Sequence, residues 1–325
     1  MVKREIIMLY LISLIAAAVP MILYLIIIWQ FDFYNIKPFK FIFKIFMWGA
    51  IGAIFFAIIG SGIVSESLSI LIKKPTELNH ISTIVIAPYI EEITKGIFLF
   101  ITFSNKKVDF ITDGLLYGSA IGLGFGMTEN FLYFITYGHS FSQWFSIVVI
   151  RSLFSGVMHC VSTGTLGAFI GYSKFNPLKN RIIFILIGLT IAISIHFAWN
   201  LSVSMESTTA IGFLFMLVTI LIFIFLYALA INTEKKMIFN ELYEEFKNGL
   251  IPLEHLIILN SGTRNKSGWV DESIRKPYIS ASTTLAFRKM ELKNSSGLSK
   301  TFYANDVEYY RQFIFNLLHI NAKLE

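Results

Sequence analysis

Long apolar runs separated by short polar stretches fill the chain as far as residue 231. Runs of this length cross a hydrocarbon core of about 30 Å as helices, so the pattern predicts about seven spans. They cover about residues 6–29, 41–63, 81–104, 113–136, 152–173, 181–203 and 208–231. The first run begins like a signal peptide, but it continues too far for one, and we interpret it as an uncleaved span.

From residue 232 onward, charged and apolar positions are mixed. Helical patterns recur at about residues 234–250, 252–259, 281–293 and 305–324, with Gly, Pro and Ser between them. We therefore predict an all-α fold in two domains. A polytopic transmembrane helix bundle covers residues 1–231, and a small helical cytosolic domain covers residues 232–325.

The composition agrees with a membrane protein. Hydrophobic residues make up 55% of the chain and charged residues 15%, with a mean hydropathy of +0.66. The net charge of +6 does not indicate a nucleic-acid partner, because most Lys and Arg residues of the bundle lie in loops beside apolar runs. Basic loops between the first and second, third and fourth, and fifth and sixth spans place the C-terminal tail in the cytoplasm. The single cysteine, Cys160, excludes a disulfide within the chain.

Three charged residues lie near the middle of the third predicted span: Glu91, Glu92 and Lys95. A charge at that depth costs roughly 2.5–3.5 kcal/mol on insertion scales, so such residues usually pair or face a wet cavity. Adjacent helical residues point about 100° apart. We therefore expect one glutamate to pair with Lys95 while the other faces a cavity. The alternative is an ordinary salt bridge between packed helices.

Other predicted spans carry matching polar groups. Glu129 and Asn130 lie near the outer end of the fourth span. The fifth span begins after Arg151 and carries His159, and the sixth carries His196 and Asn200 at i,i+4; the two histidines could also be ordinary packing residues. Counted at about 1.5 Å per residue, Glu91, Glu129 and both histidines fall between the bilayer midplane and the outer leaflet. The sequence therefore predicts one polar layer built from four spans.

Glycines recur every fourth residue along the fourth predicted span. Small residues at this spacing allow another helix to approach closely. We interpret them as a packing surface, formed by Gly114, Gly118, Gly122 and Gly126.

Glutamates and histidines in a wet pocket suit three kinds of chemistry. In hydrolysis, a carboxylate deprotonates water while histidines stabilise the developing charge. In a metal site, the same side chains bind zinc and leave a position open for water, although the chain has no HExxH motif. In a relay, they pass protons or cations.

Four sequence blocks resemble the PrsW family of intramembrane proteases. EEITK at 91–95 resembles its EExxK motif, and residues 113–134 resemble a second block that ends in FxxxEN at Phe125–Asn130. Arg151 with His159 resembles the third block, and His196 through Asn200 resembles the fourth. The resemblance covers roughly residues 10–231 and leaves out the tail. It also implies a distant relationship to the CAAX-prenyl endopeptidase and bacteriocin-immunity superfamily.

The resemblance implies a membrane-embedded hydrolase in which Glu91, Glu92 and His159 are essential. Family members carry out site-1 cleavage of membrane-anchored anti-sigma factors, so the implied partner is a single-span protein in a bacterial plasma membrane. Our hypothesis makes Glu91 or Glu92 the general base and assigns charge stabilisation to His159 and His196. Glu129 and Asn130 complete the pocket.

Lys95, Arg151 and Asn200 take supporting positions. No cofactor is assigned. Zinc is an option, and its ligands would come from Glu91, Glu92, Glu129, His159 and His196.

Two other classes of function use the same residues. A proton- or cation-coupled transporter would use the carboxylates as a relay, although the halves of the chain show no inverted repeat. An inactive scaffold would bind membrane proteins without cutting them.

Overall fold

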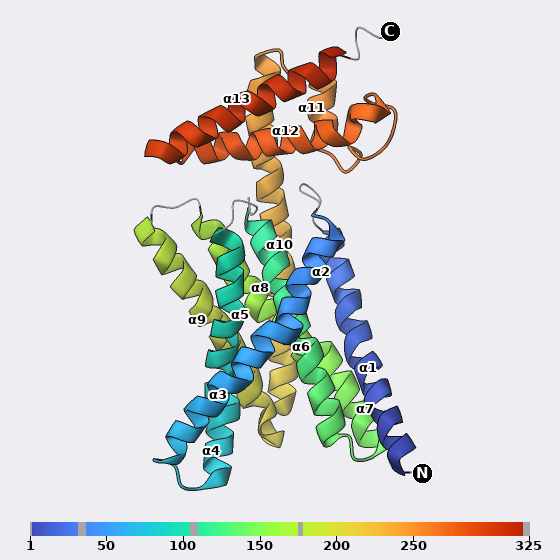
Figure 1. The fold of residues 1–325 in the computed structure, drawn as a ribbon, viewed down its shortest axis with the longest axis vertical. Coiled ribbons are helices and arrows are strands. Elements are labelled where there is room, and N and C mark those ends of the chain that lie inside the picture. The colour runs from blue at the N-terminus through green and yellow to red at the C-terminus, as the bar shows by residue number, and fades with distance from the viewer. Residues whose placement is uncertain (1, 32–36, 105–109, 175–177, 321–325) are drawn as a thin grey trace. The chain divides into compact units, whose positions relative to one another are not determined.

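A computed structural model describes residues 2–31, 37–104, 110–174 and 178–320. All regular elements among them are helical (Figure 1), which confirms the all-α prediction. The chain divides into two compact units. One contains α1 and the described residues from Lys37 to Tyr227, and the other begins at Ala228, inside helix α10. The cytosolic location of the second unit stays a prediction, as does a domain boundary after residue 231.

The first unit contains the helices that carry the apolar runs. Three of them pass through a short π-helical stretch (η), which adds a residue to a turn and is frequent at functional sites. The elements are α1 (Val2–Gln30), α2 (Phe39–Met47), η1 (Trp48–Ala53), α3 (Ile54–Ser69), α4 (Pro75–Ile81), η2 (Ser82–Ile86), α5 (Ala87–Ser104), α6 (Ile111–Tyr137), α7 (Phe141–Ile150), η3 (Arg151–Ser155), α8 (Gly156–Ser173), α9 (Leu178–Val203) and the start of α10 (Glu206–Lys247).

Five helices of the described residues are long and apolar enough to cross a membrane. They cover Ile6–Gln30, Phe39–Ser69, Phe141–Ser173, Asn180–Val203 and Glu206–Lys247. The spans predicted at 81–104 and 113–136 are also helical, in η2–α5 and α6, but their charges and glycines make them less apolar. The protein is thus a multi-pass membrane protein, and the count of seven spans stays a prediction.

The helix that carries Arg151 begins earlier than expected. A span over 152–173 would place Arg151 in front of the helix, whereas α7, η3 and α8 form one helix over Phe141–Ser173. Ser140 starts it, since its hydroxyl accepts a hydrogen bond from the Gln143 amide. Arg151 is therefore inside the helix, about two turns before His159.

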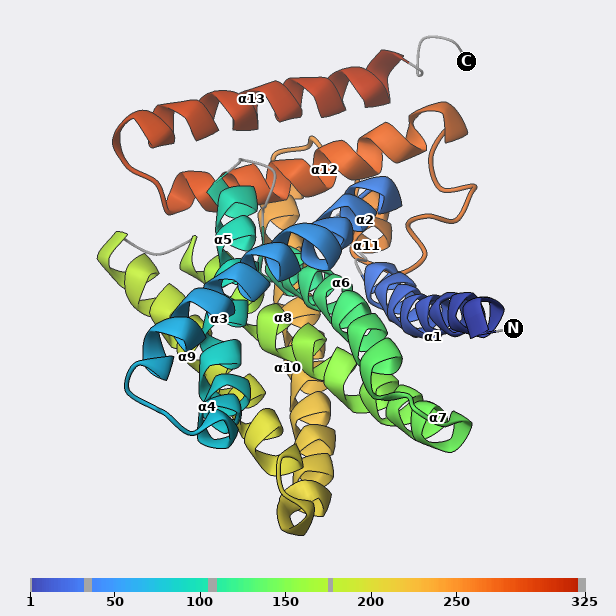
Figure 2. The same ribbon diagram turned by 60° about the horizontal axis from the view of Figure 1, so that its bottom comes forward.

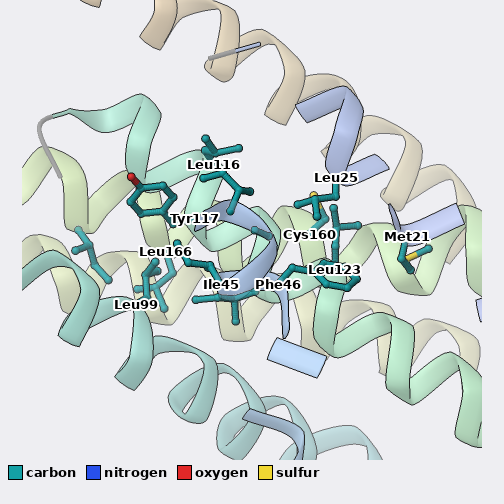
Figure 3. Close-up of a cluster of buried hydrophobic side chains, with 14 of the residues drawn as sticks. Met21, Leu25, Ile45, Phe46, Leu99, Leu116, Tyr117, Leu123, Cys160 and Leu166 are labelled. Atoms are coloured by element: carbon teal, nitrogen blue, oxygen red, sulfur yellow. The ribbon is translucent and has the colours of Figure 1, made fainter. Parts of the chain in front are cut away.

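A buried apolar cluster lies between α1, α2, α6 and α8 (Figure 3). Met21 and Leu25 of α1 and Phe46 of α2 pack there against Leu123 of α6 and Cys160 of α8. Burial of one such side chain stabilises by about 1.5–3 kcal/mol relative to exposure in water. Relative to exposure to lipid the gain is smaller, so the stability of the bundle depends on close packing between the helices.

The glycines of α6 provide this close packing. Helices α6 and α8 lie side by side in both views (Figures 1 and 2). A Cβ atom at Gly118 would lie 2.3 Å from the Thr163 carbonyl oxygen, and one at Gly122 would lie 2.0 Å from the His159 carbonyl oxygen. No larger residue fits without moving backbone, so the predicted packing surface is confirmed.

The second unit contains the rest of α10 together with α11 (Leu253–Leu259), α12 (Glu272–Lys293) and α13 (Gly297–Ile320). The last two helices begin earlier than the predicted 281 and 305. Lys289 of α12 is buried, and its ammonium lies 2.6 Å from the Glu245 carboxylate of α10. Arg311 of α13 lies 2.8 Å from the same carboxylate. These ion pairs fix α10, α12 and α13 to one another.

Candidate functional site

Four segments of the first unit bring the predicted polar side chains to one place. Helix α5 supplies Glu91, Glu92 and Lys95, and α6 supplies Glu129 and Asn130; η3–α8 supplies Arg151 and His159, and α9 supplies His196 and Asn200. The close approach of α6 to α8 positions Glu129 beside His159. A π-helical stretch precedes the site residues on both α5 and α8, as is frequent near functional sites.

Glu92 is fully buried, and four polar side chains contact its carboxylate. Lys95 Nζ donates to Oε1 at 2.8 Å and His196 Nδ1 lies 3.0 Å from the same oxygen. The hydroxyls of Ser162 and Thr163 donate at 3.1 and 3.0 Å. A buried charge is stable only when paired and hydrogen-bonded in this way. Glu92 is therefore held on both carboxylate oxygens, and its geometry is that of an anchor.

Lys95 fixes the tautomer of His159. Its Nζ is fully buried, lies 2.9 Å from His159 Nδ1, and sits 4.0 Å from the centre of the Phe125 ring. Because an ammonium group only donates, Nδ1 must accept and the proton must be on Nε2. Nε2 then donates to Glu129 Oε2 at 2.6 Å. One continuous chain of hydrogen bonds thus joins α5, α8 and α6.

Glu129 also receives a guanidinium group. Arg151 Nη2 lies 2.8 Å from Glu129 Oε2, and Arg151 Nε donates to Asn130 Oδ1 at 3.0 Å. The guanidinium stacks 3.6 Å above the Tyr133 ring. The planar fork of Arg suits this combination of ion pair, hydrogen bond and stacking, so Arg151 orients both polar residues of α6.

Glu91 differs from the other two glutamates. Its Oε2 is buried and has no hydrogen-bond partner among the described residues. The nearest charged groups stand back, with Lys95 Nζ at 3.6 Å and His196 Nε2 at 3.8 Å. Glu91 lines a cavity of about 270 Å³, together with Glu129, Asn200 and apolar residues of α3 and α6. It is thus the carboxylate placed to meet a molecule in this cavity.

Asn200 lines the same cavity as Glu91 and Glu129. Its Nδ2 donates to the Thr83 carbonyl oxygen at 2.9 Å, where Pro88 offers no backbone N–H to the preceding turn. The second N–H of the amide stays available at the cavity wall. Asn200 therefore joins α9 to η2 and lines the cavity itself.

The donor set suits a metal ion. One ligand atom each from Glu91, His159 and His196 can be chosen so that all lie within 4.8 Å of one another, and carboxylate and imidazole are zinc ligands. Glu91 Oε2 lacks a partner, and Glu92 holds His196 Nδ1, as carboxylates commonly hold metal-binding histidines. At His159 both ring nitrogens are engaged, so a metal there would replace one of those contacts.

Three contributors escaped the sequence reasoning. From the sequence, Ser162 and Thr163 were assigned no role in the site, and Phe125 was named only as part of a motif. Ser162 and Thr163 follow His159 at i+3 and i+4, which places them on its face of the helix. That spacing was a usable signal, whereas the contact of Lys95 with Phe125 depends on how α5 meets α6.

The sequence profile of the PrsW family of intramembrane metalloproteases matches residues 37–230. The protease PrsW of Bacillus subtilis is 27% identical over 115 residues, which are 34% of this chain and 49% of that protein. The protease PrsW of Shouchella clausii is 27% identical over 117 residues, covering 36% and 51%. That of Geobacillus kaustophilus is 25% identical over 171 residues, covering 52% and 70%.

The chain thus spans about half the length of the first two curated relatives. No solved structure matches it.

Proposed function

This chain belongs to the PrsW family of intramembrane metalloproteases, and we propose that it hydrolyses a peptide bond in or near the transmembrane segment of a membrane-anchored protein. The observation that carries the proposal is Glu91 Oε2, a buried carboxylate oxygen that accepts no hydrogen bond from any described residue and lies at the wall of a cavity of about 270 Å³. Structural carboxylates in membranes are paired. A carboxylate oxygen that accepts no hydrogen bond and faces a cavity is suited to act on a molecule that enters it.

In this mechanism Glu91 is the general base. Its free oxygen accepts a proton from a water molecule in the cavity, and the water attacks the peptide carbonyl carbon. The proton then passes to the leaving amine, with His196 as an intermediate carrier because its Nε2 lies 3.8 Å from Glu91 Oε2. The second N–H of Asn200 can donate to the carbonyl oxygen as negative charge develops there.

Glu92, Lys95, Glu129 and Arg151 act indirectly. Glu92 holds His196 through Nδ1, and Lys95 holds His159 through Nδ1. Glu129 contacts the other ring nitrogen of His159, and Arg151 forms an ion pair with Glu129. Groups fixed before the reaction begins need no reorganisation when charge develops, which is a large part of catalysis in sites of low dielectric.

A zinc ion fits this site, with Glu91, His159 and His196 as its ligands. When bound, it would supply an activated water and polarise the substrate carbonyl.

As the substrate we propose a single-span membrane protein, in particular an anti-sigma factor, as the family resemblance implies. The location we propose is the bacterial plasma membrane, with the C-terminal tail in the cytoplasm.

The test uses the full chain in liposomes with a single-span anti-sigma-factor-like substrate. Wild-type protein should cut it, and Glu91→Gln should not, while keeping the wild-type melting temperature. Glu66→Gln is the matched control, because Glu66 is exposed on α3 and outside the cavity lining. Equal cleavage by all three proteins would show that Glu91 is not the base.

A relay is the second candidate, favoured by the continuous chain Glu129–His159–Lys95–Glu92–His196. Proton or cation flux in the same liposomes, lost in Glu129→Gln, would support it. A protein that neither cuts nor conducts but retains the substrate would be the scaffold.

A further inference from the structure

A separate cavity of about 300 Å³ lies within the C-terminal unit. One wall is a face of α10, formed by Ala228, Ile231, Asn232 and Lys235. These residues follow the spacing i, i+3, i+4, i+7, so they form one continuous stripe of the helix. The other wall is the segment 261–265, which contributes Arg264. Nothing in the proposed proteolytic chemistry uses this cavity.

The chemistry of the lining suits an anion with several oxygens. Lys235 contributes positive charge, and the side-chain amides of Asn232 and Asn265 contribute donors. Among the described residues that line it, none is acidic. An ammonium group beside amide donors is a combination that binds phosphate.

The segment opposite α10 is held in place. Trp269 Nε1 donates to the Arg264 carbonyl oxygen at 2.9 Å, and the Lys266 amide donates to the Thr263 carbonyl oxygen at 2.8 Å. The Arg264 side chain itself is 3% exposed. A wall fixed by its own contacts loses little entropy when a ligand binds.

The position along α10 indicates where the anion comes from. The apolar run of this helix ends at Ile231, and Lys235 follows one turn later, about 6 Å along the axis. Lipid phosphates lie just beyond the end of the hydrocarbon core, which is where such a residue would meet them. Ala228 and Ile231 line the cavity and belong to the end of the apolar run. A lipid needs such an apolar contact beside its phosphate, and a free phosphate does not.

We propose that this cavity binds the phosphate headgroup of an anionic phospholipid, with Lys235 as its charged partner. With the tail in the cytoplasm, the lipid belongs to the inner leaflet, whose anionic lipids attract basic residues beside a membrane span.

The experiment measures binding of dihexanoyl phosphatidylglycerol, below its critical micelle concentration, to the full chain in a non-ionic detergent. Dispersed lipid removes the general attraction of a charged vesicle surface. Lys235→Gln should weaken binding about fivefold. Lys236→Gln is the matched control, because Lys236 is the exposed neighbour and lies outside the lining. It should leave the affinity unchanged. Both residues are exposed, and thermal unfolding should show that neither change disturbs the fold.

Dihexanoyl phosphatidylcholine and inorganic phosphate identify the source of the anion. We expect both to bind more weakly than phosphatidylglycerol. Equal losses in the two variants, or no saturable binding of phosphatidylglycerol, would overturn the site. Inorganic phosphate that binds as tightly as phosphatidylglycerol, with the same dependence on Lys235, would replace the lipid by a soluble phosphate compound and overturn the proposal.

Discussion

Gly122 offers the sharpest test of how helix packing positions the site. A Cβ atom at this position would lie 2.0 Å from the His159 carbonyl oxygen and 2.5 Å from its carbonyl carbon. Ordinary contact begins at 3.4 Å, so Gly122→Ala requires the two backbones to separate by about 1.4 Å. Both partners are helix backbone, and no change of side-chain rotamer can relieve the clash.

This displacement reaches the site directly, because it acts on the residue that carries the imidazole. His159 holds Lys95 at 2.9 Å and Glu129 at 2.6 Å, and a shift of about 1 Å breaks at least one of these contacts. Overpacking of this kind costs about 1–3 kcal/mol of stability. A misplacement of 1 Å lowers the rate of a positioned reaction by about 100-fold. We therefore expect activity to fall more than stability.

The measurement is kcat/KM for cleavage of the single-span substrate in liposomes, with a thermal melt of the same protein. Gly62→Ala is the matched control, since a Cβ atom at Gly62 of α3 meets nothing within 4 Å. Gly126→Ala is a graded case, with its nearest neighbour at 3.0 Å. The loss should be largest at Gly122, smaller at Gly126 and absent at Gly62. Wild-type kcat/KM in Gly122→Ala would refute the link between this contact and the site.

Three further outcomes follow from the contacts described above. Glu92→Ala leaves the Lys95 ammonium without its closest carboxylate, so the melting temperature should fall with a loss of about 3–5 kcal/mol. Arg151→Lys loses the hydrogen bond from Nε. A hydrogen bond from a charged group contributes about 1.5–3 kcal/mol, so kcat/KM should fall roughly tenfold or more. In the second unit, burial alone would raise the pKa of Glu245, but hydrogen bonds from Arg311 and Lys289 lower it. The ionised form therefore stabilises this unit above about pH 4.3, and the contribution is lost as the pH falls through the folded pKa. Thermal unfolding from pH 6 to pH 3 should show this loss, and Glu245→Gln should reduce it.

Much of the fold was predictable because a membrane restricts the choice of structure. Apolar runs long enough to cross it become helices, since every backbone group must be satisfied within the segment. The glycines of α6 were predictable for a similar reason, because their spacing of four residues places them on one face. The helix over Phe141–Ser173 was predicted too short. Its first turns contain aromatic and polar residues, and the charge of Arg151 was taken to lie in front of the span.

The sequence did not predict which of Glu91 and Glu92 is hydrogen-bonded to its neighbours and which lines the cavity. Their separation by about 100° on the helix shows that only one of them pairs while the other faces a cavity. Which one pairs depends on the Ser162 and Thr163 hydroxyls and on the His196 ring. These groups come from helices far along the chain, and the rotation of α5 against them is a property of the packed bundle.

The charges of the site explain why this assignment matters. Glu92 is balanced by Lys95 at 2.8 Å, and Glu129 by Arg151 at 2.8 Å. Glu91 has no cation of its own, since Lys95 stands 3.6 Å away and already serves Glu92. A buried carboxylate that shares its cation with a second carboxylate is costly to keep ionised, so it favours a further cation or a proton taken from a neighbouring water. In the proposed hydrolysis the ionised carboxylate is therefore either the base that takes a proton from water or a ligand of the metal that would activate the water. Zinc content distinguishes them: stoichiometric zinc in wild-type protein, lost in Glu91→Gln, identifies the ligand, and full cleavage by zinc-free protein identifies the base.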